Sequence, residues 1–154
     1  MTHYEISNNT FKDFFFAGKA EFTVHNEKTG NRVTYYINKS CNKGYKEDVY
    51  FVSCKVLNDE YNGKVFIGTI YRKTYFMYSK RSTLNSEHFA TRSIQWFIDN
   101  FDNLSKYPYF KLYHVGKCCK CARKLTHPDS IISGIGPECG KNINKRKSSL
   151  KINF

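Results

Sequence analysis

The stretch KAEFTVHNEKTGNRVTYYIN, residues 19–38, carries the strongest fold signal in the chain. Its two arms, residues 19–26 and 32–38, are dense in β-branched and aromatic residues, which favour strands. Between the arms, Gly30 and Asn31 tolerate the positive φ that a tight turn requires. The stretch therefore predicts an antiparallel β-hairpin.

The same pattern recurs further along the chain. Residues 48–57 and 64–71 are rich in strand-forming residues, and the loop between them ends in Asn62-Gly63, a second hairpin signal. Residues 72–80 are predicted to add another strand, and residues 109–114 a last one. In residues 71–81 aromatic side chains alternate with cations, as on a surface that stacks bases. We interpret this segment as an ordinary strand with its alternate aromatic residues in the core.

One helix is clearly predicted. Ser86 is a suitable N-cap, and Glu87 suits the positive end of a helix. The apolar residues that follow have the spacing of one helical face: Ala90, Ile94, Phe97, Ile98 and Phe101. This stripe needs an apolar partner, so residues 1–104 are predicted to form an α+β domain, an antiparallel sheet with one packed helix.

The composition limits the classes of protein to be considered. Of the 154 residues, 40% are hydrophobic, enough for a buried core. The chain has no apolar run near the roughly 20 residues of a membrane span, and residues 1–11 do not resemble a secretion signal. A cytoplasmic location is expected, where clustered cysteines bind metal more often than they form disulfides. Cys41 and Cys54 are isolated and receive no role, Cys54 being typical of a small buried hydrophobe.

The C-terminal cysteines predict a zinc site. Cys118 and Cys121 are three residues apart, so a tight turn can bring both thiolates to one tetrahedral ion. Cys139 follows a Gly-Pro turn and is expected near the start of a short helix, where the positive helix end favours a thiolate. We predict that residues 105–154 form a small module of the treble-clef or knuckle type with a basic tail, and that Zn²⁺ is its cofactor.

A fourth ligand is needed to close such a site. His114 lies on the approaching strand and is predicted to complete a Cys₃His set, with His127, Cys119 or water as alternatives. A site closed by four ligands is structural, because a catalytic zinc keeps an open position with a base nearby. The sequence shows no other catalytic constellation, so we predict that the protein is not an enzyme.

The same segment resembles a known family. The motif C-x-x-C-x-R-K-L-T-x-P-x-S-I, residues 118–131, and the motif G-I-G-P-x-C, residues 134–139, resemble a zinc-binding domain of unknown function in phage, plasmid and actinobacterial hypothetical proteins. In that family a His-x-x-x-Cys lead-in is frequent, which supports His114, and the position of Cys119 is commonly glycine. Arg123 and Ser130 belong to the motif, and we expect them to brace the zinc loop.

The first hundred residues also resemble what often precedes that domain. The matching segments are GKAEFT (18–23), TGNRVTY (29–35), FVS (51–53), IGTI (67–70), SK (79–80) and IQWF (94–97). The resemblance implies a viral or mobile-element origin, with the bacterial host cytoplasm as the location if the chain is phage-encoded, and implies no activity.

Charge points to a polyanionic partner. Residues 104–154 hold eleven Lys and Arg against two acidic residues, a net charge of +9, whereas residues 1–103 hold fourteen against eleven, a net of +3. Such an excess attracts nucleic acid and would also suit an acidic protein. The predicted binding residues are Lys117, Lys120, Arg123 and Lys124 beside the cysteines and Lys141, Lys145, Arg146 and Lys147 in the tail.

Three functions are compatible with these features. The first is a non-enzymatic viral or mobile-element protein that binds DNA, RNA or a host complex that handles nucleic acid. The second is a protein-directed inhibitor of a host defence or transcription machine, such as an anti-CRISPR-like phage factor. A zinc hydrolase or nuclease is a weaker third, and neither a membrane nor a small-molecule substrate is indicated.

Overall fold

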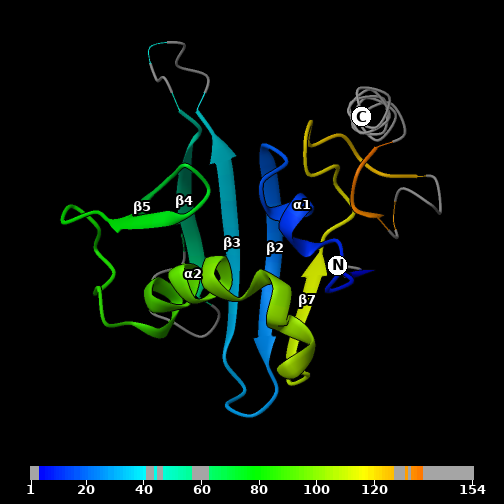
Figure 1. Cartoon of the computed structure of the whole chain (residues 1–154), viewed down its shortest axis with the longest axis horizontal. Coiled ribbons are helices and arrows are strands. Elements are labelled where there is room, and N and C mark those ends of the chain that lie inside the picture. The colour runs from blue at the N-terminus through cyan, green and yellow to red at the C-terminus, as the bar shows by residue number, and fades with distance from the viewer. Residues whose placement is uncertain are drawn as a thin grey trace, which may run out of the picture.

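The computed structural model describes residues 4–40, 44, 47–56, 63–126, 131 and 133–136. In this part of the chain, seven strands form one antiparallel sheet in the order β1-β7-β2-β3-β4-β5-β6 (Figure 1). The elements are β1 (Tyr4–Glu5), α1 (Phe11–Phe15), β2 (Lys19–Asn26), β3 (Arg32–Lys39), β4 (Val49–Val56), β5 (Val65–Tyr71), β6 (Tyr75–Tyr78), α2 (Phe89–Asn100), the 3₁₀ helix η1 (Phe101–Lys106) and β7 (Phe110–His114). The α+β class and the antiparallel sheet are as predicted.

Both predicted pairs of strands are present. β2 pairs with β3 from Lys19↔Asn38 to His25↔Arg32, and β4 pairs with β5 with a shift of register at Val52/Ser53. Residues 58–62 of the predicted second turn, and residue 57 of the strand before it, lie outside the described residues. β6 is shorter than the predicted strand of residues 72–80, because Arg72 and Lys73 have φ of 56° and 60° and form a turn after β5. Within β6 the exposed positions alternate with half-buried ones, so half of its side chains face the core, as expected of an ordinary strand.

The core lies between one face of the sheet and the helices. Figure 1 shows α1 and α2 on the same side of the sheet. From α1, Phe11 contacts Phe22 of β2 and Phe97 of α2 edge to face, with ring centroids 5.0 and 5.7 Å apart. The Tyr35 hydroxyl on β3 donates a hydrogen bond of 2.6 Å to the Ala90 carbonyl, so the ring anchors α2 to the sheet. Cys54 is 1% exposed in this core, as expected.

The start of α2 differs from the prediction. His88 caps the helix, with Nδ1 accepting the Ala90 backbone N–H at 3.1 Å. Ser86 does not, because the preceding segment is folded into a turn around Asn85, whose side chain accepts the Glu87 N–H at 2.8 Å and whose carbonyl accepts the His88 N–H. None of the helices described is long and apolar enough to span a membrane.

The sheet extends beyond residue 104. β7 lies between β1 and β2 and pairs with both of them, with His114 opposite Tyr4 on one side and Phe22 on the other. The predicted domain boundary thus falls within η1, ahead of a strand that belongs to the sheet. His114, at the end of this strand, leads directly from the sheet into the cysteine-rich segment.

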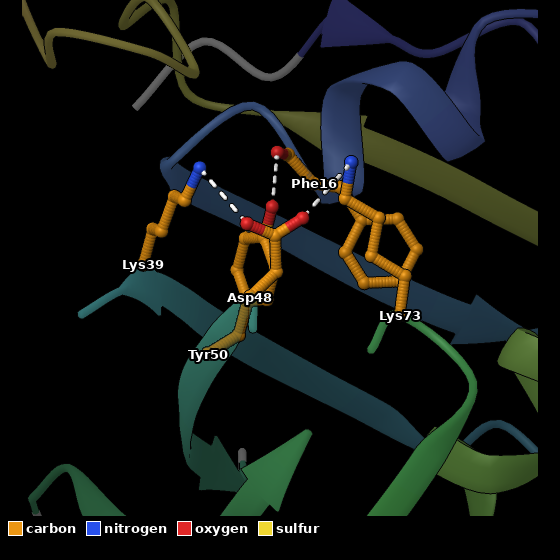
Figure 2. A network of polar contacts seen from close by, with 5 residues as sticks. All are labelled: Phe16, Lys39, Asp48, Tyr50 and Lys73. Carbon is orange, nitrogen blue, oxygen red and sulfur yellow. Dashed lines mark hydrogen bonds and ion pairs between the residues drawn. The ribbon is translucent and has the colours of Figure 1, made fainter. Parts of the chain in front are cut away.

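A polar network secures the end of α1 to the sheet (Figure 2). The Asp48 carboxylate lies 3.3 Å from the Lys39 ammonium and 3.6 Å from that of Lys73. Beside it, the Tyr50 hydroxyl donates a hydrogen bond of 3.0 Å to the Phe16 carbonyl. Burial, with the nearby Asp48 charge, raises the pKa of Tyr50 to about 12, so this hydroxyl stays a donor at neutral pH. The ion pairs are half exposed and contribute little, whereas the buried tyrosine fixes the geometry.

Candidate metal centre

The segment 117–124, the knuckle turn, is a closed loop that carries Cys118 and Cys121. Its end residues form an isolated antiparallel bridge. The Cys118 N–H donates to the Arg123 carbonyl, and the Ala122 N–H donates to the Cys118 carbonyl, both at 2.8 Å. Ala122 has a φ of 63°, a left-handed conformation that closes the turn and disfavours residues other than glycine. The loop thus has the tight form that the cysteine spacing predicts.

The Cys118 sulfur is buried and surrounded by hydrogen-bond donors. Its side chain is fully covered, and the Gly136 N–H lies 3.1 Å from Sγ. Burial raises the pKa of the Cys118 thiol, but hydrogen bonds from the backbone of Gly136, Cys121 and Lys120 and from the Cys121 thiol outweigh burial, so the net pKa is lowered. Donors directed at sulfur stabilise the thiolate, which is the form that binds metal.

His114 is buried and held by backbone groups on both ring nitrogens. Nδ1 accepts the Gly116 N–H at 3.0 Å, and Nε2 lies 2.6 Å from the Ile131 carbonyl oxygen. A carbonyl can only accept, so the ring is the neutral tautomer with its proton on Nε2. The ring stacks on Tyr4 and lies against Phe14, with centroids 5.3 and 5.8 Å away. Burial lowers the pKa of His114, which keeps the ring neutral, although the Ile131 carbonyl partly offsets this effect.

These contacts bear on the predicted ligand set. Among the described residues, no three or more His, Cys, Asp or Glu side chains form a group that could hold a metal, so His114 is not assembled with Cys118 and Cys121. A metal on Nε2 would move the ring proton to Nδ1, where it would face the Gly116 N–H. A metal on Nδ1 would displace that N–H. Cys139 and the alternative ligand His127 lie outside the described residues.

Cys119 has a different environment from its neighbour. Its side chain is 2% exposed within the hydrophobic core, its N–H donates to the Gly134 carbonyl at 2.9 Å, and its carbonyl accepts the Lys19 N–H at 2.7 Å. Gly134 has a φ of 75°, and a Cβ there would lie 2.5 Å from the Phe14 ring. Cys119 and Gly134 therefore join the knuckle turn to β2 and α1.

The predicted cations near the cysteines are at the surface. Lys117, Arg123 and Lys124 are exposed, and Lys120 is half-buried. Beside them a hollow of about 580 Å³ has Tyr4, Lys117, Lys124 and Leu125 among its lining residues. The predicted tail cations Lys141, Lys145, Arg146 and Lys147 and the motif residue Ser130 lie outside the described residues.

Spacing of residue types does not reveal the donors around Cys118 or the acceptor on His114. The groups involved are the Gly136 N–H and the Ile131 carbonyl, which are backbone atoms and carry no residue signature. The one sequence feature that indicates these contacts is the motif containing Gly134 and Gly136, because glycine lets the backbone approach another group closely.

The comparisons with known proteins concern this same segment. Curated proteins and solved structures give no match to the chain. Residues 113–144 match DUF6011, a family of unknown function. The matched residues include the knuckle turn and all four predicted ligands, so this part of the chain is similar to a family without an assigned activity.

Proposed function

We propose that this chain is a non-enzymatic, viral or mobile-element protein that binds nucleic acid in the cytoplasm of a bacterial host. In this proposal the knuckle turn is fixed by one zinc ion and presents cations to the phosphate backbone. The observation that supports it most is the combination of a buried Cys118 sulfur receiving backbone N–H groups with exposed Lys117, Arg123 and Lys124 on the same turn.

The thiolates of Cys118, Cys121 and Cys139 hold the zinc in this proposal. For the fourth position we favour His127 over His114, because both ring nitrogens of His114 are already bonded to backbone groups. His114 then acts as a brace that fixes the segments at Gly116 and Ile131. A zinc with four protein ligands has no open position for a substrate, so its contribution is to the fold.

The cations act by neutralising phosphates. Lys117, Lys120, Arg123 and Lys124 sit on a turn closed by backbone hydrogen bonds, so their anchoring backbone loses little conformational entropy on binding. Contacts to phosphate carry no base information, which predicts an affinity that is similar for different sequences and falls with salt. The basic tail adds contacts of the same kind.

Metal analysis tests the ligand assignment. Purified protein should contain about one zinc per chain, because three thiolates at this spacing leave few alternatives. His127→Gln should lose zinc, whereas His114→Gln should retain it and weaken only the packing of the segment. The cobalt-substituted protein gives a second readout, since its absorption reports the number of thiolate ligands. Full zinc in His127→Gln together with loss in His114→Gln would restore His114 as the ligand.

Binding measurements test the functional part. Lys120→Gln and Arg123→Gln should each weaken binding to labelled DNA and RNA at low salt, and the matched change Lys106→Gln should have less effect. Lys106 is an exposed cation at the end of η1, before β7, whereas the knuckle turn follows β7. A wild-type protein that binds one host protein and no nucleic acid would replace this proposal by the protein-directed inhibitor.

A further inference from the structure

In the part of the chain that the structure describes, no helix covers the second face of the sheet. Alternation along β2 and β3 places Phe22 and Tyr35 under the helices and places Thr23 and Thr34 on the opposite side. Both α-helices lie on the Phe22 side (Figure 1). We call the Thr23 side the open face.

A hollow of about 460 Å³ lies on this face, within the roughly 300–1,000 Å³ typical of ligand sites. The strand register places Tyr113, Thr23, Thr34 and Lys55 in one row across β7, β2, β3 and β4. The two threonines are shorter than the residues that flank them, so they form the floor. Tyr36, two residues after Thr34 on the same face of β3, supplies a second ring.

The floor of the hollow is polar. The hydroxyl oxygens of Thr23 and Thr34 lie 2.8 Å apart, and either can be the donor. Thr23 is 5% exposed and Thr34 is half-buried, so Thr34 is the hydroxyl that a ligand reaches more readily. A single proton serves the bond between them, so when Thr23 donates it, the Thr34 proton can be donated to a ligand. The rings of Tyr113 and Tyr36 lie beside this pair of hydroxyls, which can donate and accept hydrogen bonds. Such a site suits a flat heteroaromatic group with a polar edge.

The surroundings of the hollow are positive. Arg32, Lys55 and Lys117 line it, and Glu21 is the one carboxylate among the described lining residues. The Lys64 ammonium lies 4.4 Å from the centroid of the Tyr36 ring, so a fourth cation is held at the rim. Lys117 also lines the hollow beside the knuckle turn. The cations of the proposed binding surface therefore continue onto the open face.

We propose that this hollow receives an unpaired base of a single-stranded nucleic acid. The base stacks on Tyr113 or Tyr36 and places its polar edge on the threonine pair, while Arg32, Lys55 and Lys117 contact the flanking phosphates. A duplex cannot bind in this way, because its bases are stacked on each other and their pairing edges are occupied. The inference rests on the proposed function and adds the class of nucleic acid to it.

The test compares a short labelled single strand, the blunt duplex of the same sequence and the free mononucleotide, at one salt concentration. The strand should bind the zinc-loaded protein about tenfold more tightly than the duplex. Replacing the tyrosine on which the base stacks, by Tyr36→Leu or Tyr113→Leu, should lower the affinity for the strand about tenfold and leave the salt dependence unchanged, because stacking involves no ion release. Tyr75→Leu is the matched control, since Tyr75 is 54% exposed on β6 and does not line the hollow.

The outcomes separate this inference from the proposed function. Equal binding of strand and duplex, or full strand affinity in both tyrosine variants, overturns the inference and leaves the proposed function standing. A mononucleotide that binds as tightly as the strand also overturns it, in favour of a nucleotide site. If no nucleic acid binds at low salt, both proposals fall.

A crosslinking measurement on the wild-type protein tests the same inference without relying on the folding of any variant. A strand with a photoreactive base should crosslink to Tyr36 or Tyr113, as located by mass spectrometry of the digested protein. Crosslinks confined to the knuckle turn would contradict a base in the hollow and would support phosphate contacts alone.

Discussion

The helix-covered face of the sheet and the knuckle turn are stabilised in different ways. On the covered face, Phe11, Phe22 and Phe97 are fully buried, and the Phe11 ring contacts the other two. In the knuckle turn, the buried Cys118 sulfur is surrounded by backbone donors, and the cations Lys117, Arg123 and Lys124 are exposed. The covered face can therefore fold through apolar burial alone, whereas the knuckle turn buries few apolar side chains and is expected to depend on the proposed zinc.

The largest expected effect is the loss of stability when a ring of the covered face is removed, compared with the removal of an exposed ring. Phe11→Ala should lower the free energy of unfolding by about 3–5 kcal/mol, because it removes a ring and leaves a cavity. Tyr75→Ala should change it by less than about 0.5 kcal/mol, since that ring is exposed. Urea unfolding followed by circular dichroism measures both. A small effect of Phe11→Ala would mean that the core repacks around the missing ring.

The next effect concerns the metal. Cys118→Ser should abolish zinc binding and lower stability by about 2.7 kcal/mol at zinc concentrations near 100 times the dissociation constant. The sheet, β7 included, should stay folded, as judged by amide signals in NMR spectra. Chelator should destabilise the wild type and leave Cys118→Ser unchanged. A wild-type melting temperature that does not respond to chelator would contradict a structural metal.

A smaller effect tests the contact that joins the two regions. Gly134→Ala should cost about 1–3 kcal/mol, because the new Cβ meets the Phe14 ring and the residue has a positive φ. Pairing it with Phe14→Leu should recover part of the loss if steric contact is the main cause. Thermal unfolding of the two single variants and the double variant measures this coupling. Strict additivity would show that the backbone conformation alone is responsible.

The smallest expected effect is a gain. Ala122→Gly should stabilise the knuckle turn by about 1 kcal/mol, because glycine adopts the left-handed conformation of this position without a steric penalty. Tighter zinc retention against a competing chelator is the sensitive readout. Ala17→Gly, at a position with negative φ, is the control and should give no gain. Weaker zinc retention in Ala122→Gly would indicate that the flexibility gained by the unfolded loop outweighs the relief of the left-handed conformation.

Much of the sheet could be predicted from sequence because its strands are long and alternate regularly. The hairpin of β2 and β3 and the apolar stripe of α2 are local patterns with a clear period. α1 and β1 have only five and two residues and carry no such period. α1 forms because Phe11, Phe14 and Phe15 are buried against the rest of the core, a cause that local sequence does not contain.

The candidate sites, too, are predictable from sequence only where their residues lie close together along the chain. The cysteine spacing predicts the tight turn at Cys118 and Cys121, because both residues lie within one local loop. The role of His114 depends on the Gly116 and Ile131 backbone groups, which spacing does not encode. The hollow on the open face is formed by residues of four strands in one register. The sequence alone does not give this register, so it does not indicate a role for Tyr36 and Tyr113.

Nucleic-acid binding is tested most directly by titrating the zinc-loaded wild-type protein with a labelled single strand over a series of salt concentrations. We expect measurable affinity at low salt and a linear fall of log affinity with log salt. When Lys145, Arg146 and Lys147 are made neutral, the slope should decrease by about 0.7 for each phosphate that these side chains neutralise in the wild type. No affinity for any strand or duplex at low salt, from a protein that retains its zinc, would contradict nucleic-acid binding.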